Sequence, residues 1–119
     1  MSTDANLRLD VREEAGRPTL AVITGPLDLH TAPSLHRQVT LILHQSPSLI
    51  LVLTGVTYCD SSGLNTLLRL HLHAQDSGGR LTVAGPPAQL VRMLTVTGMD
   101  TVLPVYGTVA ESQETYGPS

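Results

Sequence analysis

The sequence contains no phenylalanine, no tryptophan, no lysine and a single cysteine, Cys59. Because 41% of its 119 residues are hydrophobic all the same, the core must be built from aliphatic side chains, which suits a sheet covered by helices. A single cysteine excludes an intramolecular disulfide and is compatible with a reducing compartment. We expect one domain over residues 1–119, with a core at about 7–106 and frayed ends at 1–6 and 111–119.

Positive charge is also scarce. The chain has seven basic residues, all arginine and scattered along the sequence, and its net charge is −3. No basic patch forms, so nucleic acid and anionic membranes are poor candidates for partners. The longest apolar run, 49–53, is far shorter than the roughly 20 residues that span a bilayer. The first residues lack the pattern of a signal peptide, and we therefore expect a cytoplasmic protein without a membrane partner.

Strand and helix patterns alternate along the chain. Alternating apolar residues at 7–12 and an apolar run at 19–24 flank a Gly-Arg-Pro turn and predict a hairpin. The pattern predicts an α/β sandwich with a mostly parallel sheet of four or five strands, an antiparallel N-terminal edge hairpin and three or four helices. The later elements are expected as a helix from a Thr31 cap to residue 45, a strand at 48–53, a helix at 62–75, a strand at 81–84, a helix at 87–95, a strand at 102–106 and a terminal turn at 108–114.

Two polar segments follow parallel strands, GPLDLHTA at 25–32 and GVTYCDSSGL at 55–64. The carboxyl ends of parallel strands meet at one edge of an open sheet, which is where such folds place their sites. Asp60, Ser61 and Ser62 are all preferred helix caps, but one cap explains only one of them. We expect Ser62 to cap the helix and Ser61 to be a free hydroxyl, at a position where a phosphate would meet helix N–H groups.

These segments resemble the STAS-domain anti-sigma factor antagonists of bacteria. The resemblance rests on GPLDLHTAPSL, GVTYCDSSGLNTLL and GGRLTVAGPPAQLVRMLTVTGMDTVLPVY, and it covers about residues 7–106. It implies that the unphosphorylated chain binds an anti-sigma factor serine kinase, which frees a sigma factor, and that phosphorylation of Ser61 by that kinase switches binding off. Stress response or sporulation would be the setting.

The resemblance also implies the residues that bind the partner. Asp28 matches the acidic residue of the neighbouring loop, and the full set is Asp28, His30, Thr31, Asp60, Ser62, Gly63 and Leu64. The protein itself would need no cofactor and would not be an enzyme, and we expect a monomer because the pattern predicts no exposed apolar face. One departure is visible: relatives often carry aspartate where this chain has Val52, which concerns the outer end of the strand and the choice of kinase.

The alternative within this fold is a STAS-like domain that senses a small ligand or scaffolds a signalling complex. Two other classes lack essential parts. A response-regulator receiver needs a lysine and an acidic pair after a parallel strand, and a serine hydrolase needs a G-x-S-x-G segment.

The five histidines lack the spacing of a metal site, so we expect no metal ligand. His71 falls on the apolar stripe formed with Leu64, Leu67, Leu68 and Leu72, where a histidine at the edge of the core is the simpler interpretation. A reactive thiolate at Cys59 near a helix start competes with a simpler role as a small packed side chain.

Overall fold

The structure, a computed structural model, describes residues 7–116 and confirms the predicted fold class. Five strands form one sheet in the order β1-β2-β3-β4-β5, in which β1 pairs with β2 antiparallel and every other pair is parallel. The elements are β1 (Arg8–Arg12), β2 (Thr19–Leu27), α1 (Ala32–Gln45), β3 (Ser48–Cys59), α2 (Ser61–Asp76), β4 (Arg80–Ala84), α3 (Ala88–Thr97), a 3-10 turn (Met99–Thr101), β5 (Val105–Tyr106) and α4 (Val109–Glu114).

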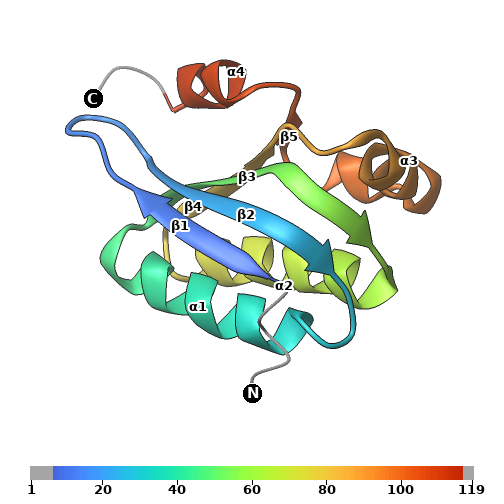
Figure 1. The fold of residues 1–119 in the computed structure, drawn as a ribbon. Coiled ribbons are helices and arrows are strands. Elements are labelled where there is room, and N and C mark those ends of the chain that lie inside the picture. The colour runs from blue at the N-terminus through green and yellow to red at the C-terminus, as the bar shows by residue number, and fades with distance from the viewer. Residues whose placement is uncertain (1–6, 117–119) are drawn as a thin grey trace.

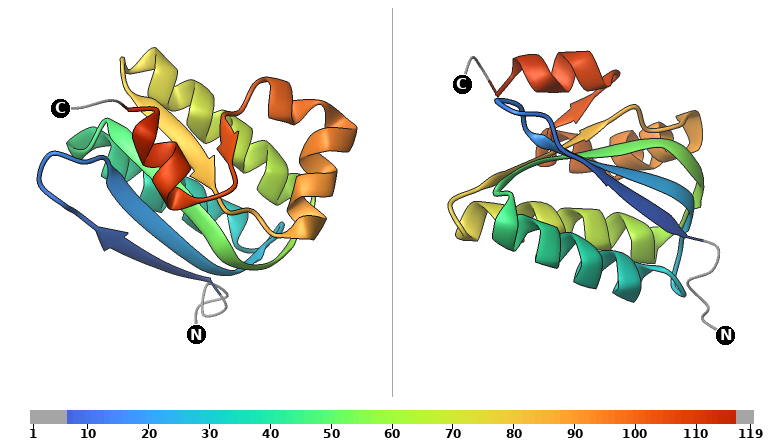
Figure 2. Two further views of the ribbon diagram at one scale, coloured as in Figure 1. Left: turned by 90° about the horizontal axis from the view of Figure 1, so that it is seen from above. Right: turned by 60° about the vertical axis from the view of Figure 1, so that its left-hand side comes forward.

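The sheet separates two unequal layers (Figure 1). Helices α1 and α2 lie side by side on one face, and the views in Figure 2 agree on this arrangement. The main core fills this layer and consists almost wholly of leucine, isoleucine, valine and alanine, as the composition predicts. Helix α4 lies on the opposite face over a small cluster of Ile50, Val52 and Ala84. None of the helices in the described part of the chain is both long and apolar enough to cross a membrane.

The terminal turn expected at 108–114 is present as α4, so part of the segment expected to be frayed at 111–119 has regular structure. A capping box between Thr108 and Glu111 starts α4. The hydroxyl of Tyr116 then donates to the carbonyl oxygen of Leu49 at 2.8 Å, and the hydroxyls of Ser112 and Thr82 lie 2.6 Å apart. Residues 1–6 and 117–119, also predicted to be frayed, lie outside the described residues.

Both strands that lead to the predicted site are longer than expected. β2 runs on through Leu27 and β3 through Cys59, so residues 25–27 and 55–59 are strand and not loop. The register between β2 and β3 shifts twice, once beside Gly25. The φ angle of Gly25 is 112°, a conformation that glycine adopts readily and other residues rarely do. Glycine and proline suggested breaks in the sequence, but the parallel neighbour supplies the hydrogen bonds that continue the strand.

The remaining elements follow the predictions within a few residues, with two exceptions. The strand expected at 102–106 is reduced to Val105–Tyr106, because the N–H groups of Val102 and Leu103 donate back to the carbonyl oxygen of Met99. Pro104 has no N–H to donate to a neighbouring strand. On α2 the buried stripe includes His71 as expected, but Leu72 is exposed, and Leu70 and Ala74 are buried in its place. Val52 lies well before the end of β3 and packs in the cluster near α4, so it is not at the outer end of the strand.

Candidate functional site

The two polar segments meet where β2 and β3 end. Leu27 and Cys59 are partners in the last register pair, and the N–H of Asp60 donates to the carbonyl oxygen of Leu27 at 3.0 Å. The β2–α1 loop and the start of α2 are thereby held next to each other. This confirms the sequence expectation that both segments leave the same edge of the sheet.

The carboxylate of Asp60 joins these two segments. Its Oδ1 accepts from the N–H of Gly63 at 3.0 Å and caps α2, while Oδ2 accepts from the N–H of Leu29 at 3.1 Å. The prediction that Ser62 caps the helix is therefore wrong. Asp60 has the extended backbone of an N-cap residue, whereas Ser61 and Ser62 already belong to the first turn of the helix.

Ser61 is the first residue of α2, and its side chain is exposed. Within the described residues its hydroxyl makes no hydrogen bond, in contrast to the Asp60 carboxylate beside it. The positive end of the helix dipole lies at this position. The hydroxyl is therefore free to react, and the helix start can accommodate the negative charge that a phosphate would add.

Asp28 and Thr31 fold the β2–α1 loop upon itself. Oδ1 of Asp28 accepts from the N–H groups of His30 at 2.9 Å and Thr31 at 3.1 Å. The hydroxyl of Thr31 donates to the carbonyl oxygen of Pro26 at 2.8 Å and accepts from the N–H of Asp28 at 3.0 Å. Thr31 precedes α1 as predicted, but its side chain makes no capping bond, because its hydroxyl is used in this turn.

Three of the residues expected to bind a partner are buried. Thr31 is 2% exposed and Leu64 is 3% exposed, and Gly63 packs directly against β2. A Cβ atom on Gly63 would overlap the carbonyl oxygen of Leu27 and come within 2.8 Å of its Cβ. In this conformation these residues have no side chain at the surface, and they position the site instead.

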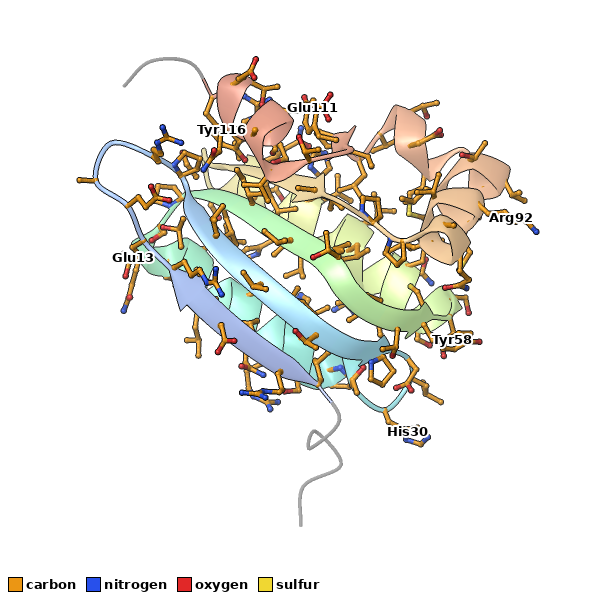
Figure 3. The ribbon with its side chains drawn as sticks, turned by 45° about the horizontal axis from the view of Figure 1, so that its top comes forward. Glu13, His30, Tyr58, Arg92, Glu111 and Tyr116 are labelled. Atoms are coloured by element: carbon orange, nitrogen blue, oxygen red, sulfur yellow. The ribbon has the colours of Figure 1, made fainter. Side chains whose placement is uncertain are left out.

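Exposed apolar and aromatic side chains lie on the two segments that meet at Asp60, next to Ser61 in the chain. Leu29 is 65% exposed and Tyr58 is 51% exposed, and His30 is exposed beside them. Figure 3 shows His30 and Tyr58 at the same end of the molecule. We call Leu29, His30, Tyr58 and Ser61 the switch surface. Sequence reasoning missed Leu29 and Tyr58, although large apolar residues inside otherwise polar segments were a signal that could have revealed them.

The end of β3 is braced by α3. The side-chain amide of Gln89 accepts from the N–H of Cys59 at 3.0 Å and donates to its carbonyl oxygen at 2.8 Å, as a neighbouring strand would. Burial, and then the charge of Asp60, raises the pKa of the Cys59 thiol to about 12. The thiol is therefore a packed side chain and not a thiolate, and the role of Gln89 had no signal in the sequence.

A groove of about 480 Å³ runs beside the switch surface between the first halves of α1 and α2. Its lining includes Ser62, His36 and Arg69. Burial, together with the neighbouring Arg69 and His73, lowers the pKa of His36. Farther along the same pair of helices, His44 and His73 lie edge to face with ring centroids 6.3 Å apart, a contact that sequence spacing did not predict. No group of three or more metal-ligating side chains occurs among residues 7–116.

Known proteins resemble this chain over most of its length. The anti-sigma-B factor antagonist of Bacillus subtilis is 25% identical over 100 residues, which cover 84% of this chain and 91% of that protein. The crystal structure of an anti-sigma factor antagonist from Mycobacterium paratuberculosis superimposes with a TM-score of 0.80 at 23% identity, covering 94% of this chain and 95% of that one.

The antagonist SpoIIAA of Bacillus shares the fold in two forms. The unphosphorylated structure gives a TM-score of 0.72 at 15% identity and covers 92% of this chain and 96% of that one. The phosphorylated structure gives a TM-score of 0.67 at 15% identity and covers 92% of this chain and 99% of that one. The family model for the STAS domain matches residues 9–112, nearly the whole of the described chain. On this match the chain belongs to the STAS domain family.

Proposed function

We propose that this protein is an anti-sigma factor antagonist whose binding is switched by phosphorylation of Ser61. The unphosphorylated form binds an anti-sigma factor serine kinase through the switch surface and thereby releases a sigma factor in the bacterial cytoplasm. The partner kinase holds the ATP and performs the chemistry, and this chain acts by binding. The names of the relatives support the antagonist role, and the free hydroxyl of Ser61 supports the switch.

The exposed Ser61 hydroxyl is the observation that carries the proposal. It lies within a surface whose apolar members, Leu29 and Tyr58, are the kind of side chains that anchor protein interfaces. The Asp60 carboxylate is engaged by Gly63 and Leu29 and fixes the position of both flanking segments. A kinase would therefore meet a hydroxyl on a rigid helix start.

The switch follows from electrostatics. Phosphate adds a charge of roughly −1.5 to −2 at Ser61, next to the carboxylate of Asp60. A phosphate that finds no cation in a closely packed interface must be desolvated without compensation, which costs several kcal/mol. Because each 1.4 kcal/mol changes affinity about tenfold, a loss of a hundredfold or more requires no change of fold.

Phosphate mapping tests this assignment. Incubation with ATP and each candidate anti-sigma kinase encoded in the same genome should place one phosphate on Ser61, as measured by mass spectrometry. Ser61→Ala should receive none. Ser61→Asp should bind the kinase about a hundredfold more weakly than the unmodified protein in calorimetry.

Ser62→Ala is the matched control, because Ser62 is the adjacent residue and carries the same hydroxyl. This variant should still be phosphorylated and should still bind the kinase. A phosphate mapped to Ser62, or unchanged kinase binding by Ser61→Asp, would contradict the assignment.

The second candidate is a STAS-like domain that senses a small ligand or scaffolds a signalling complex. The groove beside Ser62 favours it, since about 480 Å³ is within the range of small-molecule sites and Arg69 could meet an anion there. A pull-down discriminates between the two. An ATP-binding kinase as the main captured protein supports the antagonist, whereas a stoichiometric small molecule released on denaturation supports the sensor.

A further inference from the structure

The outer edge of β1 is free in the described part of the chain. β1 is the first strand of the sheet, and β2 is the one strand that pairs with it. In Figure 2, seen from above, no coloured element lies beyond β1. An edge of this kind presents unpaired backbone N–H and C=O groups that can pair with another strand.

The side chains of this edge carry charges without partners. Arg8, Asp10 and Arg12 are exposed, and successive alternate residues of a strand lie on the same face. Among residues 7–116 none of these three charges is in an ion pair. Their register partners on β2 are uncharged, namely Thr24, Val22 and Leu20.

The charges along β1 can pair with the charges of a second, antiparallel copy of the same strand. If two β1 strands run antiparallel with Val11 opposite Val11 of the partner subunit, Asp10 lies opposite Arg12 of the partner subunit, and the reverse pair forms by symmetry. Val11 is 46% exposed, and it would gain an apolar contact on the axis.

We propose that β1 pairs with β1 of a second copy in this register, so that the two sheets join into one. The proposal replaces the monomer expected from the sequence and is independent of the switch at Ser61. Charges on an edge strand often serve to prevent pairing. Here the signs alternate, and a register centred on Asp10 would place like charges opposite each other, which is destabilising. A register centred on Leu9 would also pair opposite charges, Arg8 with Asp10 of the partner subunit. The exposure of Val11, against the half-buried side chain of Leu9, favours the register centred on Val11.

Charge reversal tests the register by sedimentation velocity of the full chain over a range of concentrations. Asp10→Arg alone and Arg12→Asp alone each place like charges opposite each other twice, and each should raise the dimer dissociation constant on the order of tenfold or more. The double variant Asp10→Arg/Arg12→Asp should restore dimerisation. An equimolar mixture of the two single variants should also associate, as a heterodimer.

Controls keep the result specific. Arg92→Asp changes the net charge as Arg12→Asp does but lies on α3, and it should leave the dissociation constant unchanged. Circular dichroism shows whether each variant keeps its fold. Three outcomes would overturn the proposal: a monomer at every concentration, a dimer indifferent to these reversals, or a mixture in which Asp10→Arg pairs better with Arg8→Asp than with Arg12→Asp.

Discussion

A single carboxylate organises the candidate site at the scale of the residue. Asp60 caps α2 through one oxygen and holds the β2–α1 loop through the other. Any one of three adjacent polar residues could have capped the helix. Because Asp60 takes this role, Ser61 and Ser62 are left in the first turn, and the hydroxyl of Ser61 is at the surface.

Gly63 should be the least tolerant position in the first turn of α2. In Gly63→Ala the added Cβ would overlap the carbonyl oxygen of Leu27, so α2 must move away from β2. We expect a loss of about 1–3 kcal/mol in the free energy of unfolding, as for other overpacked sites. Urea denaturation measures it, and phosphorylation at Ser61 should fall in parallel because the helix start is displaced.

Gly107→Ala is the control for this substitution. Its Cβ would meet only Oε1 of Glu111 at 3.1 Å, and a shift of a few tenths of an ångström in that side chain would relieve the contact. We expect Gly107→Ala to lower the free energy of unfolding by less than about 1 kcal/mol. Equal losses for the two variants would show that the contact with Leu27 does not limit position 63.

At the scale of the element, α4 is what closes the second face of the sheet. It is short, at Val109–Glu114, and such a helix has little stability of its own. Its position depends on tertiary contacts: Ser112 reaches Thr82, and Tyr116 reaches both Thr82 and Leu49. The guanidinium of Arg80 lies 4.5 Å from the centroid of the Tyr116 ring and covers it.

Removal of the Tyr116 hydroxyl should loosen this helix. Tyr116→Phe leaves the carbonyl oxygen of Leu49 without this donor, and we expect a loss of about 1–2 kcal/mol in the free energy of unfolding near pH 7. Tyr106→Phe is the control, because within the described residues the Tyr106 hydroxyl makes no hydrogen bond. The free energy of unfolding of Tyr106→Phe should stay within about 0.5 kcal/mol of that of the natural protein.

The stability that the Tyr116 hydroxyl contributes should depend on pH, which a comparison of the natural protein with Tyr116→Phe can show. Burial raises the pKa of the Tyr116 hydroxyl, against opposing effects of Thr82 and Arg80. The folded state therefore holds this proton more tightly than the unfolded state, and the resulting stability is present below about pH 10 and lost as the pH rises further. The difference in stability between the natural protein and Tyr116→Phe should shrink above pH 10. A constant difference would show that the hydroxyl is not buried.

At the scale of the whole molecule, the proposed switch and the proposed dimer edge use different parts of one sheet. Ser61 follows β3, in the middle of the sheet, whereas β1 is at its margin. Neither surface requires the core to change. Regulation at one end can therefore act on partner binding while the sheet itself stays intact.

Phosphorylation should accordingly leave the fold and its stability nearly unchanged. The Ser61 hydroxyl gives up no hydrogen bond within residues 7–116, and the helix dipole favours the new charge while Asp60 opposes it. We expect the melting temperature of the phosphorylated protein to stay within about 4 °C of the unmodified one, which calorimetry measures. A larger fall, or loss of a cooperative transition, would mean that the switch works by unfolding.

Sequence by itself determined the order of strands and helices, the aliphatic core and the meeting of the two polar segments at one edge. Those features depend on the periodicity of neighbouring residues and on the rules of parallel sheets, so local patterns are enough to predict them. The free hydroxyl of Ser61 was also predicted correctly, but the cap was assigned to Ser62, since any of the three polar residues suits that position.

Only the tertiary structure decided the rest, because the deciding partners are distant in sequence. β2 and β3 extend because each strand is hydrogen-bonded to its neighbour, and Gln89 braces Cys59 from 30 residues away. The docking of α4 depends on a bond between Tyr116 and Leu49, 67 residues apart. Residues 25–27, 55–59 and 111–116 carry breakers or polar side chains, and contacts made across the fold order them despite that local preference.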